Sequence, residues 1–121
     1  MAVRFGQSLP TAGANATPEN IRTLAQRAED LGFDSVWVSD HLVIPHSIGS
    51  NYPYTQDGAT PFSPRGTYLD SITTLAYIAG CTERLRLTTN VLILPYRNPV
   101  IAAKQLATLD VLSGGRLTLG L

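Results

Sequence analysis

Aspartate and histidine stand side by side at positions 40 and 41, one serine after a short apolar run that includes Val36 and Val38. The run is typical of a strand buried on both faces, and its end delivers two polar side chains to one place. An imidazole can donate a hydrogen bond or move a proton near neutral pH, and a neighbouring carboxylate can fix its tautomer. The pair therefore predicts a site for proton or hydrogen-bond chemistry, with an ordinary loop cap as the alternative.

A metal site is the second chemistry that these residues allow, with Asp40, His41 and His46 as its ligands. Adjacent residues on an extended chain point to opposite faces, and no further ligand follows at a recognisable spacing. The pattern therefore favours a site without a metal. The single cysteine, Cys81, has no local histidine or basic cluster to activate it, so we expect a packed thiol rather than a nucleophile.

Strands and helices alternate along the chain and must position the Asp-His pair. A cap residue followed by proline marks a helix start at Thr17-Pro18 and again at Asn98-Pro99. Glycine follows each of the three expected helices, as is usual at helix ends. The expected order is strand 3–8, helix 18–31, strand 35–38, helix 68–80, strand 85–91, helix 99–113 and strand 116–121.

Alternating apolar strands and helices indicate an α/β fold with a parallel sheet and right-handed crossovers. The first strand-to-helix connection, QSLPTAGANATPEN, lacks the G-x-G-x-x-G pattern, which disfavours a Rossmann dinucleotide site. An open doubly wound sheet and a (β/α)8 barrel both fit the alternation. A barrel usually needs about 250 residues, of which this chain supplies about half.

Residues 42–67 form an irregular loop, rich in Pro, Gly and Ser, between the second strand and the second helix. Loops of this length are uncommon unless they are functional or disordered. Aromatic residues within and beside the loop argue against disorder: Tyr52, Tyr54, Phe62 and Tyr68. We expect a lid over a site.

The composition excludes several classes of partner. Nine basic and nine acidic residues cancel, and no basic patch emerges, which argues against nucleic acid. No apolar run approaches the roughly 20 residues that span a bilayer, and the N-terminus lacks the apolar core of a signal peptide. One cysteine rules out an internal disulfide framework and suits a reducing compartment, so we expect a cytoplasmic protein.

Two segments, AEDLGFDSVWVSDHL and LTTNVLILPYRNPVIAAKQLATLDVLSGGRLTLGL, resemble the N-terminal half of the bacterial luciferase-like monooxygenase family, in particular its F420-dependent oxidoreductase branch. The likeness covers nearly the whole chain apart from residues 46–66. It implies about four β/α units of a (β/α)8 TIM-type barrel, as a single partial domain over residues 1–121. It also implies coenzyme F420, with FMN as the alternative, and hydride transfer between F420 and a small organic substrate.

The resemblance assigns roles to residues at the carboxyl ends of the strands. It implies that His41 is catalytic beside the cofactor ring and that Asp40 contacts the deazaflavin or orients His41. The Asn90–Val91 bond would be a cis peptide behind the ring, and Arg97 would reach a phosphate or carboxylate of the cofactor tail, a solvated loop arginine being the alternative. The implied cofactor-binding set is Asp40, His41, Thr89, Asn90, Val91, Ile93 and Arg97.

The chain departs from the family in length, because family members continue with strands five to eight. Four strands cannot close a barrel, and the last would expose an unpaired edge. We therefore expect a fragment of a longer product, with a homo-oligomer or a second chain supplying the missing half as alternatives. A non-catalytic half-barrel and an FMN-dependent monooxygenase are the alternative functions. Asp110 and Arg116 are expected to be structural, tying the third helix to the foot of the fourth strand.

Overall fold

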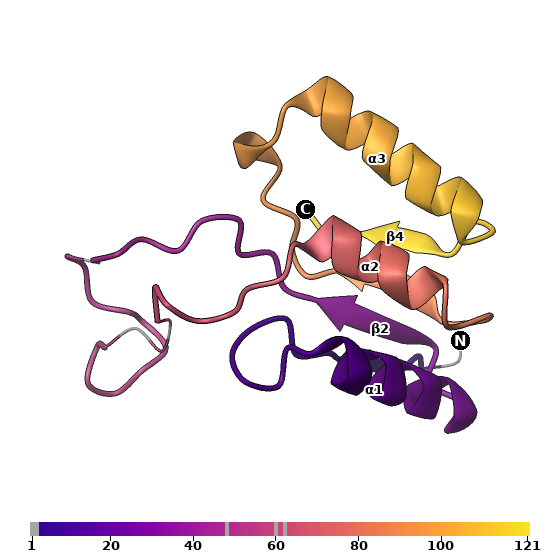
Figure 1. The fold of residues 1–121 in the computed structure, drawn as a ribbon, viewed down its shortest axis with the longest axis horizontal. Helices are drawn as coiled ribbons and strands as arrows, with labels where there is room; N and C mark the ends of the chain where they lie inside the picture. The colour runs from indigo at the N-terminus through magenta and orange to yellow at the C-terminus, as the bar shows by residue number, and fades with distance from the viewer. Residues whose placement is uncertain (1–2, 48, 60, 62) are drawn as a thin grey trace.

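The computed structural model describes residues 3–47, 49–59, 61 and 63–121. Four parallel strands form one sheet in the order β1-β2-β3-β4, and successive strands are joined through a helix (Figure 1). The elements are β1 (Gly6–Ser8), α1 (Pro18–Asp30), β2 (Ser35–Val38), α2 (Ser71–Ala79), β3 (Arg86–Thr89), the 3-10 turn η1 (Leu94–Tyr96), α3 (Pro99–Leu112) and β4 (Leu117–Leu119). The prediction of an alternating, parallel α/β fold is confirmed.

Capping side chains determine where α1 and α3 begin. Thr17 Oγ1 accepts a hydrogen bond of 3.2 Å from the Asn20 amide. Asn98 Oδ1 accepts from the amides of Val100 and Ile101 at 3.0 and 3.3 Å. Proline follows each cap, where its missing N–H leaves no hydrogen bond unmade. Both helix starts are as predicted.

The hydrophobic core lies between the sheet and the three helices, which cover one face of it (Figure 1). Val36 and Val38 of β2 and Leu87 of β3 point into this layer and are fully buried. Helix α2 contacts both β2 and β3 and therefore sits over the middle of the sheet. The helices contribute Ile21, Ala25, Ala28, Ile72, Leu75, Ile78 and Leu109.

The opposite face of the sheet carries the alternate residues of each strand. Trp37 of β2 is only half-buried, and Arg86 of β3 is exposed. The Arg86 guanidinium lies along this face and donates to Thr118 Oγ1 at 3.0 Å and to the Leu117 carbonyl at 3.1 Å. The expected burial of β2 on both faces is therefore not found, because the described residues cover one face alone.

Arg116, which precedes β4, holds the N-terminal ends of the strands together. Its guanidinium donates to the carbonyls of Ala79 and Leu85 at 3.0 and 3.1 Å, and its Nε donates to the Ser113 carbonyl at 2.7 Å. These bonds tie the ends of α2 and α3 to the start of β3, which confirms a structural role. Asp110 contributes at the same end through its carbonyl, which accepts a 2.8 Å bond from the glycine turn after α3.

Glu29, near the end of α1, also holds this N-terminal face together. Its carboxylate accepts hydrogen bonds from the amides of Glu83 at 3.1 Å, Arg84 at 2.6 Å and Leu85 at 3.0 Å. Burial alone would raise the pKa of Glu29. The three amide bonds and the charge of Arg84 together lower the pKa by more than burial raises it. The pKa of Glu29 therefore lies below the ordinary glutamate value.

A depressed folded-state pKa means that Glu29 stabilises the fold above the range in which an ordinary glutamate titrates. This contribution is lost as pH falls through that range towards the folded pKa. We expect Glu29→Gln to melt below the wild type at about pH 7, with the difference shrinking at about pH 3.5. Thermal denaturation followed by circular dichroism measures this, with the exposed side chain of Glu83→Gln as the control. A difference that stays constant with pH would contradict the assignment.

Candidate active site

The carboxyl ends of β2 and β3 meet at one edge of the sheet. The two strands pair in register up to Val38 and Thr89, and the Asn90 amide then donates to the Val38 carbonyl at 2.9 Å. The loops that follow these strands therefore leave the sheet side by side. This edge corresponds to the end of a β/α barrel at which active sites form. The two predicted segments, 40–41 and 89–97, are thus brought together.

Asp40 joins these loops through a fully buried side chain. Its Oδ2 accepts a hydrogen bond of 2.9 Å from the Ile93 amide. Its Oδ1 accepts from Ser71 Oγ at 2.9 Å and from Arg97 Nη2 at 2.7 Å. With Asp70, these residues form what we call the Asp40 network: Asp40, Asp70, Ser71, Ile93 and Arg97. The network links the loop after β2, the start of α2 and the loop after β3.

Arg97 bridges two carboxylates in this network. Its Nη2 lies 2.7 Å from Asp40 Oδ1 and 2.9 Å from Asp70 Oδ2, and its side chain is 10% exposed. Burial lowers the pKa of Arg97, but hydrogen bonds to Asp70 and Asp40 raise it more, so the guanidinium stays charged. Two carboxylates already neutralise this cation, which gives it a structural role. Its contact with a cofactor tail stays a prediction.

Asp70 and Ser71 belong to the network but were not predicted from the sequence. Asp70 caps α2, because its Oδ1 accepts from the amide and the hydroxyl of Thr73, both at 2.8 Å. Burial alone would raise the pKa of Asp70. The Thr73 amide and Arg97 lower the pKa by more than burial raises it, so the carboxylate stays ionised at neutral pH. Aspartate is one of the residues favoured at a helix N-cap. The expected helix start at residue 68 hid this signal, since α2 begins at Ser71.

His41 follows Asp40 directly and is half-buried. Its ring contacts the ring of Tyr68 edge to face, with centroids 6.3 Å apart. At the same edge of the sheet, Asn90 and Val91 are exposed, and the peptide bond between them is cis, which confirms that expectation. An imidazole donor, an amide and an apolar surface are the groups that a planar flavin-type ring requires, so the residues fit such a cofactor.

Thr89 lies on the helix side of the sheet and is 1% exposed. Its hydroxyl donates to the Gly120 carbonyl and accepts from the Gly120 amide, both at 3.1 Å. A Cβ on Gly120 would collide with the Thr89 carbonyl, so this junction between β3 and β4 requires glycine. The Thr89 hydroxyl thus links the end of β3 to the residue that follows β4. A contact between Thr89 and a cofactor stays a prediction.

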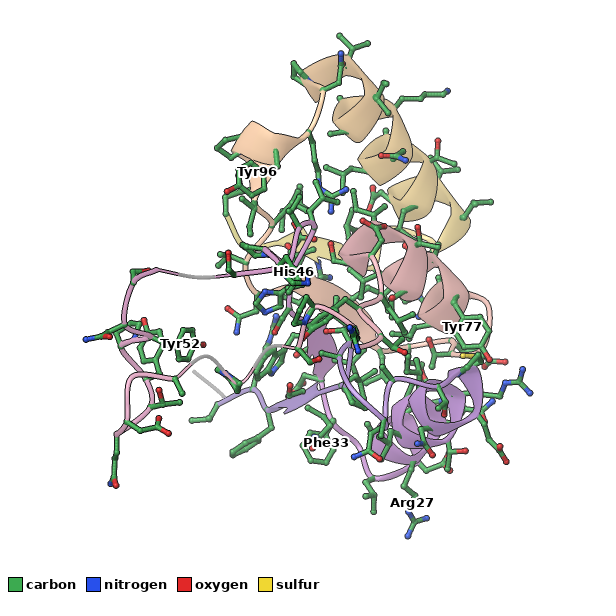
Figure 2. All side chains as sticks on the ribbon, turned by 60° about the vertical axis from the view of Figure 1, so that its left-hand side comes forward. Arg27, Phe33, His46, Tyr52, Tyr77 and Tyr96 are labelled. Atoms are coloured by element: carbon green, nitrogen blue, oxygen red, sulfur yellow. The ribbon has the colours of Figure 1, made fainter. Side chains whose placement is uncertain are left out.

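The described residues of the loop 42–67 project outward beyond the carboxyl ends of the strands (Figure 1). Tyr52 and Tyr54 pack edge to face in it with ring centroids 5.5 Å apart, and Figure 2 shows Tyr52 far from the sheet. Phe62, named with them as part of a lid, lies outside the described residues. The described residues of this segment contain no helix or strand, and a lid function stays a prediction.

The described residues form neither a cluster for a metal ion nor a membrane-spanning helix. Within the described ranges, no group of three or more His, Cys, Asp or Glu side chains could hold a metal ion. His46, the third ligand of the metal alternative, is exposed, and the Asp40 carboxylate already serves the network. Across the same part of the chain, no helix has the length and apolar character needed to cross a membrane.

Comparisons with known proteins agree with this geometry. A family model described as luciferase-like monooxygenase matches residues 1–121. An uncharacterized protein of Mycobacterium tuberculosis is 37% identical over 97 residues, which make up 80% of this chain and 34% of that protein. The F420-dependent glucose-6-phosphate dehydrogenase of Amycolatopsis mediterranei is 33% identical over 104 residues, which make up 85% of this chain and 26% of that enzyme.

A solved structure extends the likeness to three dimensions. The coenzyme F420-dependent tetrahydromethanopterin reductase from Methanopyrus kandleri matches with a TM-score of 0.70 and 27% identity, over 99% of this chain and 27% of that one. The chain thus spans about a third or less of the length of these proteins. Its four parallel strands and the three α-helices between them are those of a TIM-type barrel. With a family model that matches from the first residue to the last, the chain belongs to the luciferase-like monooxygenase family.

Proposed function

We propose that the polypeptide carrying these residues is an oxidoreductase that transfers hydride between the deazaflavin F420 and a small organic substrate. The observation that carries this proposal is the Asp40 network, which fixes the His41 loop against the loop after β3 at the C-terminal edge of the sheet. The choice of F420 is supported by the similar glucose-6-phosphate dehydrogenase and tetrahydromethanopterin reductase, whose names state F420 dependence.

The residues of this chain would hold the cofactor and handle a proton. The bound deazaflavin would supply the ring carbon that accepts or gives up hydride. His41 would donate a hydrogen bond to the ring or hold a proton beside it, because imidazole does both near neutral pH. Asn90, Val91 and Ile93 would form the surface on which the ring lies. Asp40 would act indirectly, by holding these loops in place.

We further propose that the remaining units of a β/α barrel cover the open face of the sheet. Trp37 and Arg86 support this. They lie on the sheet face opposite the helices, where Trp37 is only half-buried and Arg86 is exposed, so this face has room for a covering layer. Further units of the same polypeptide are the favoured source, and a homo-oligomer is the alternative. A cytoplasmic location suits this soluble cofactor chemistry and remains part of the proposal.

Cofactor binding tests the proposal directly. The complete polypeptide that carries these residues is titrated into F420 and, separately, into FMN, and the quenching of cofactor fluorescence is followed. We expect saturable quenching of F420 at lower protein concentrations than for FMN. His46→Gln should quench cofactor fluorescence at the same protein concentrations as the wild type, because His46 is exposed in the loop. Tighter binding of FMN would favour a flavin-dependent monooxygenase, and binding of neither would overturn the proposal.

A further inference from the structure

We infer that Tyr68 is a positioning residue for the His41 imidazole, an inference that rests on the function proposed for His41. The two rings meet at 63° with centroids 6.3 Å apart. Aromatic rings prefer such edge-to-face contacts at roughly 4.5–7 Å. The second side-chain torsion of histidine is broad and roughly two-fold, so local packing decides the plane of the imidazole. A neighbouring ring that fixes this plane also fixes the direction in which the ring N–H points.

The backbone of Tyr68 is itself held on both sides. Tyr68 forms an antiparallel bridge with Ala12, and the Leu69 amide donates to the Thr11 carbonyl at 2.9 Å. Two residues further on, Asp70 caps α2 and pairs with Arg97 in the Asp40 network. The segment that carries Tyr68 is therefore anchored to the same network that anchors the segment carrying His41. The two rings are held at a fixed separation by backbone contacts outside the long loop.

Gly66 also packs against the Tyr68 ring. A Cβ at position 66 would lie 3.1 Å from Tyr68 Cε2 and 3.5 Å from its hydroxyl oxygen. A methyl group there therefore crowds the ring, and it also crowds the Ser63 carbonyl oxygen at 3.2 Å. Tyr68 also lines a groove of about 310 Å³ together with Ile21 and Tyr77. Gly66→Ala thus disturbs the position of the Tyr68 ring without changing either member of the aromatic pair.

Nuclear magnetic resonance of the histidine ring protons tests this inference without any cofactor. The signals of His41 and His46 are assigned in the complete protein through His41→Gln and His46→Gln. We expect Tyr68→Leu to shift the His41 signals, because the ring current of Tyr68 is lost, and Tyr68→Phe to leave them close to wild type. Gly66→Ala should shift them by a smaller amount, and the His46 signals should stay in place.

Tyr54→Leu is the matched control, since it removes one ring from another edge-to-face pair, with Tyr52, in the exposed loop. It should leave the His41 signals unchanged. In F420-linked turnover, we expect Tyr68→Leu to lower kcat about tenfold with little change in the KM for F420, and Tyr68→Phe to retain activity.

Each outcome supports or overturns the inference. Unchanged His41 signals in Tyr68→Leu, or an equal shift in Tyr54→Leu, would overturn it. If Tyr68→Leu does not fold, Tyr68→Phe and Gly66→Ala still decide, because both keep the aromatic ring. A shift of His41 in the expected variants, together with full turnover in His41→Gln, would leave the positioning intact and reject the catalytic role proposed for His41 instead.

Discussion

Asp40→Ala is expected to destabilise the fold by about 3–5 kcal/mol, the usual cost of removing one partner from a buried ion pair. The Asp40 side chain is fully buried, and its loss would leave the Arg97 cation with Asp70 alone. The Ile93 amide and the Ser71 hydroxyl would also lose their acceptor. Urea unfolding followed by circular dichroism gives the free energy of unfolding of both proteins.

Asp57→Ala provides the control for this comparison. Asp57 lies in the exposed loop, where its Oδ1 accepts a 3.0 Å bond from the Ala59 amide, and its removal should cost less than about 1 kcal/mol. The double variant Asp40→Ala/Arg97→Met should recover part of the loss, because it also removes the buried cation. Equal stabilities of Asp40→Ala and Asp57→Ala would show that the network does not support the fold.

His41→Gln is expected to lower kcat for F420-linked hydride transfer by about 10²- to 10⁴-fold, the usual contribution of a positioned proton-transfer group. Glutamine is close to histidine in size and can donate a hydrogen bond, but it cannot move a proton. F420 binding should persist, because Asp40 holds the loops that form the ring surface. Steady-state kinetics together with the fluorescence titration separate turnover from binding.

The same loop supplies the control for His41. His46 is exposed and lies five positions further along, so His46→Gln should turn over like the wild type. Wild-type turnover in His41→Gln would remove histidine from the chemistry. A loss of F420 binding together with turnover would instead assign His41 to cofactor affinity.

Elements with local signals were predictable from the sequence. Strand β2 has the expected bounds, Ser35–Val38, because a buried apolar run between polar residues specifies it. Helices α1 and α3 begin where Thr17 and Asn98 precede proline, since a cap and a fixed φ act on neighbouring residues alone. The Asp-His pair and the Asn90–Val91 segment also fall at the expected edge of the sheet.

Features that depend on distant partners were not predictable in this way. Helix α2 begins three residues later than expected, because residues 67–69 pair instead with the segment that follows β1. Strand β1 is shorter than expected, since pairing with β2 begins at Gly6. The role of Asp40 depends on Arg97, which lies 57 positions away, and no local pattern connects the two.

The contact between Asp40 and Ser71 has a consequence for protein engineering. A bond of 2.9 Å joins Asp40, two residues before the long loop, to the first residue of α2, so the two ends of the loop are already held together by the body of the molecule. Lengthening a loop between fixed ends adds little entropic cost. The part of the loop from residue 46 to the residue before Ser63 therefore forms a natural cassette, in which foreign or randomised segments can be exchanged while the turn beside Tyr68 and the frame that carries His41 stay in place.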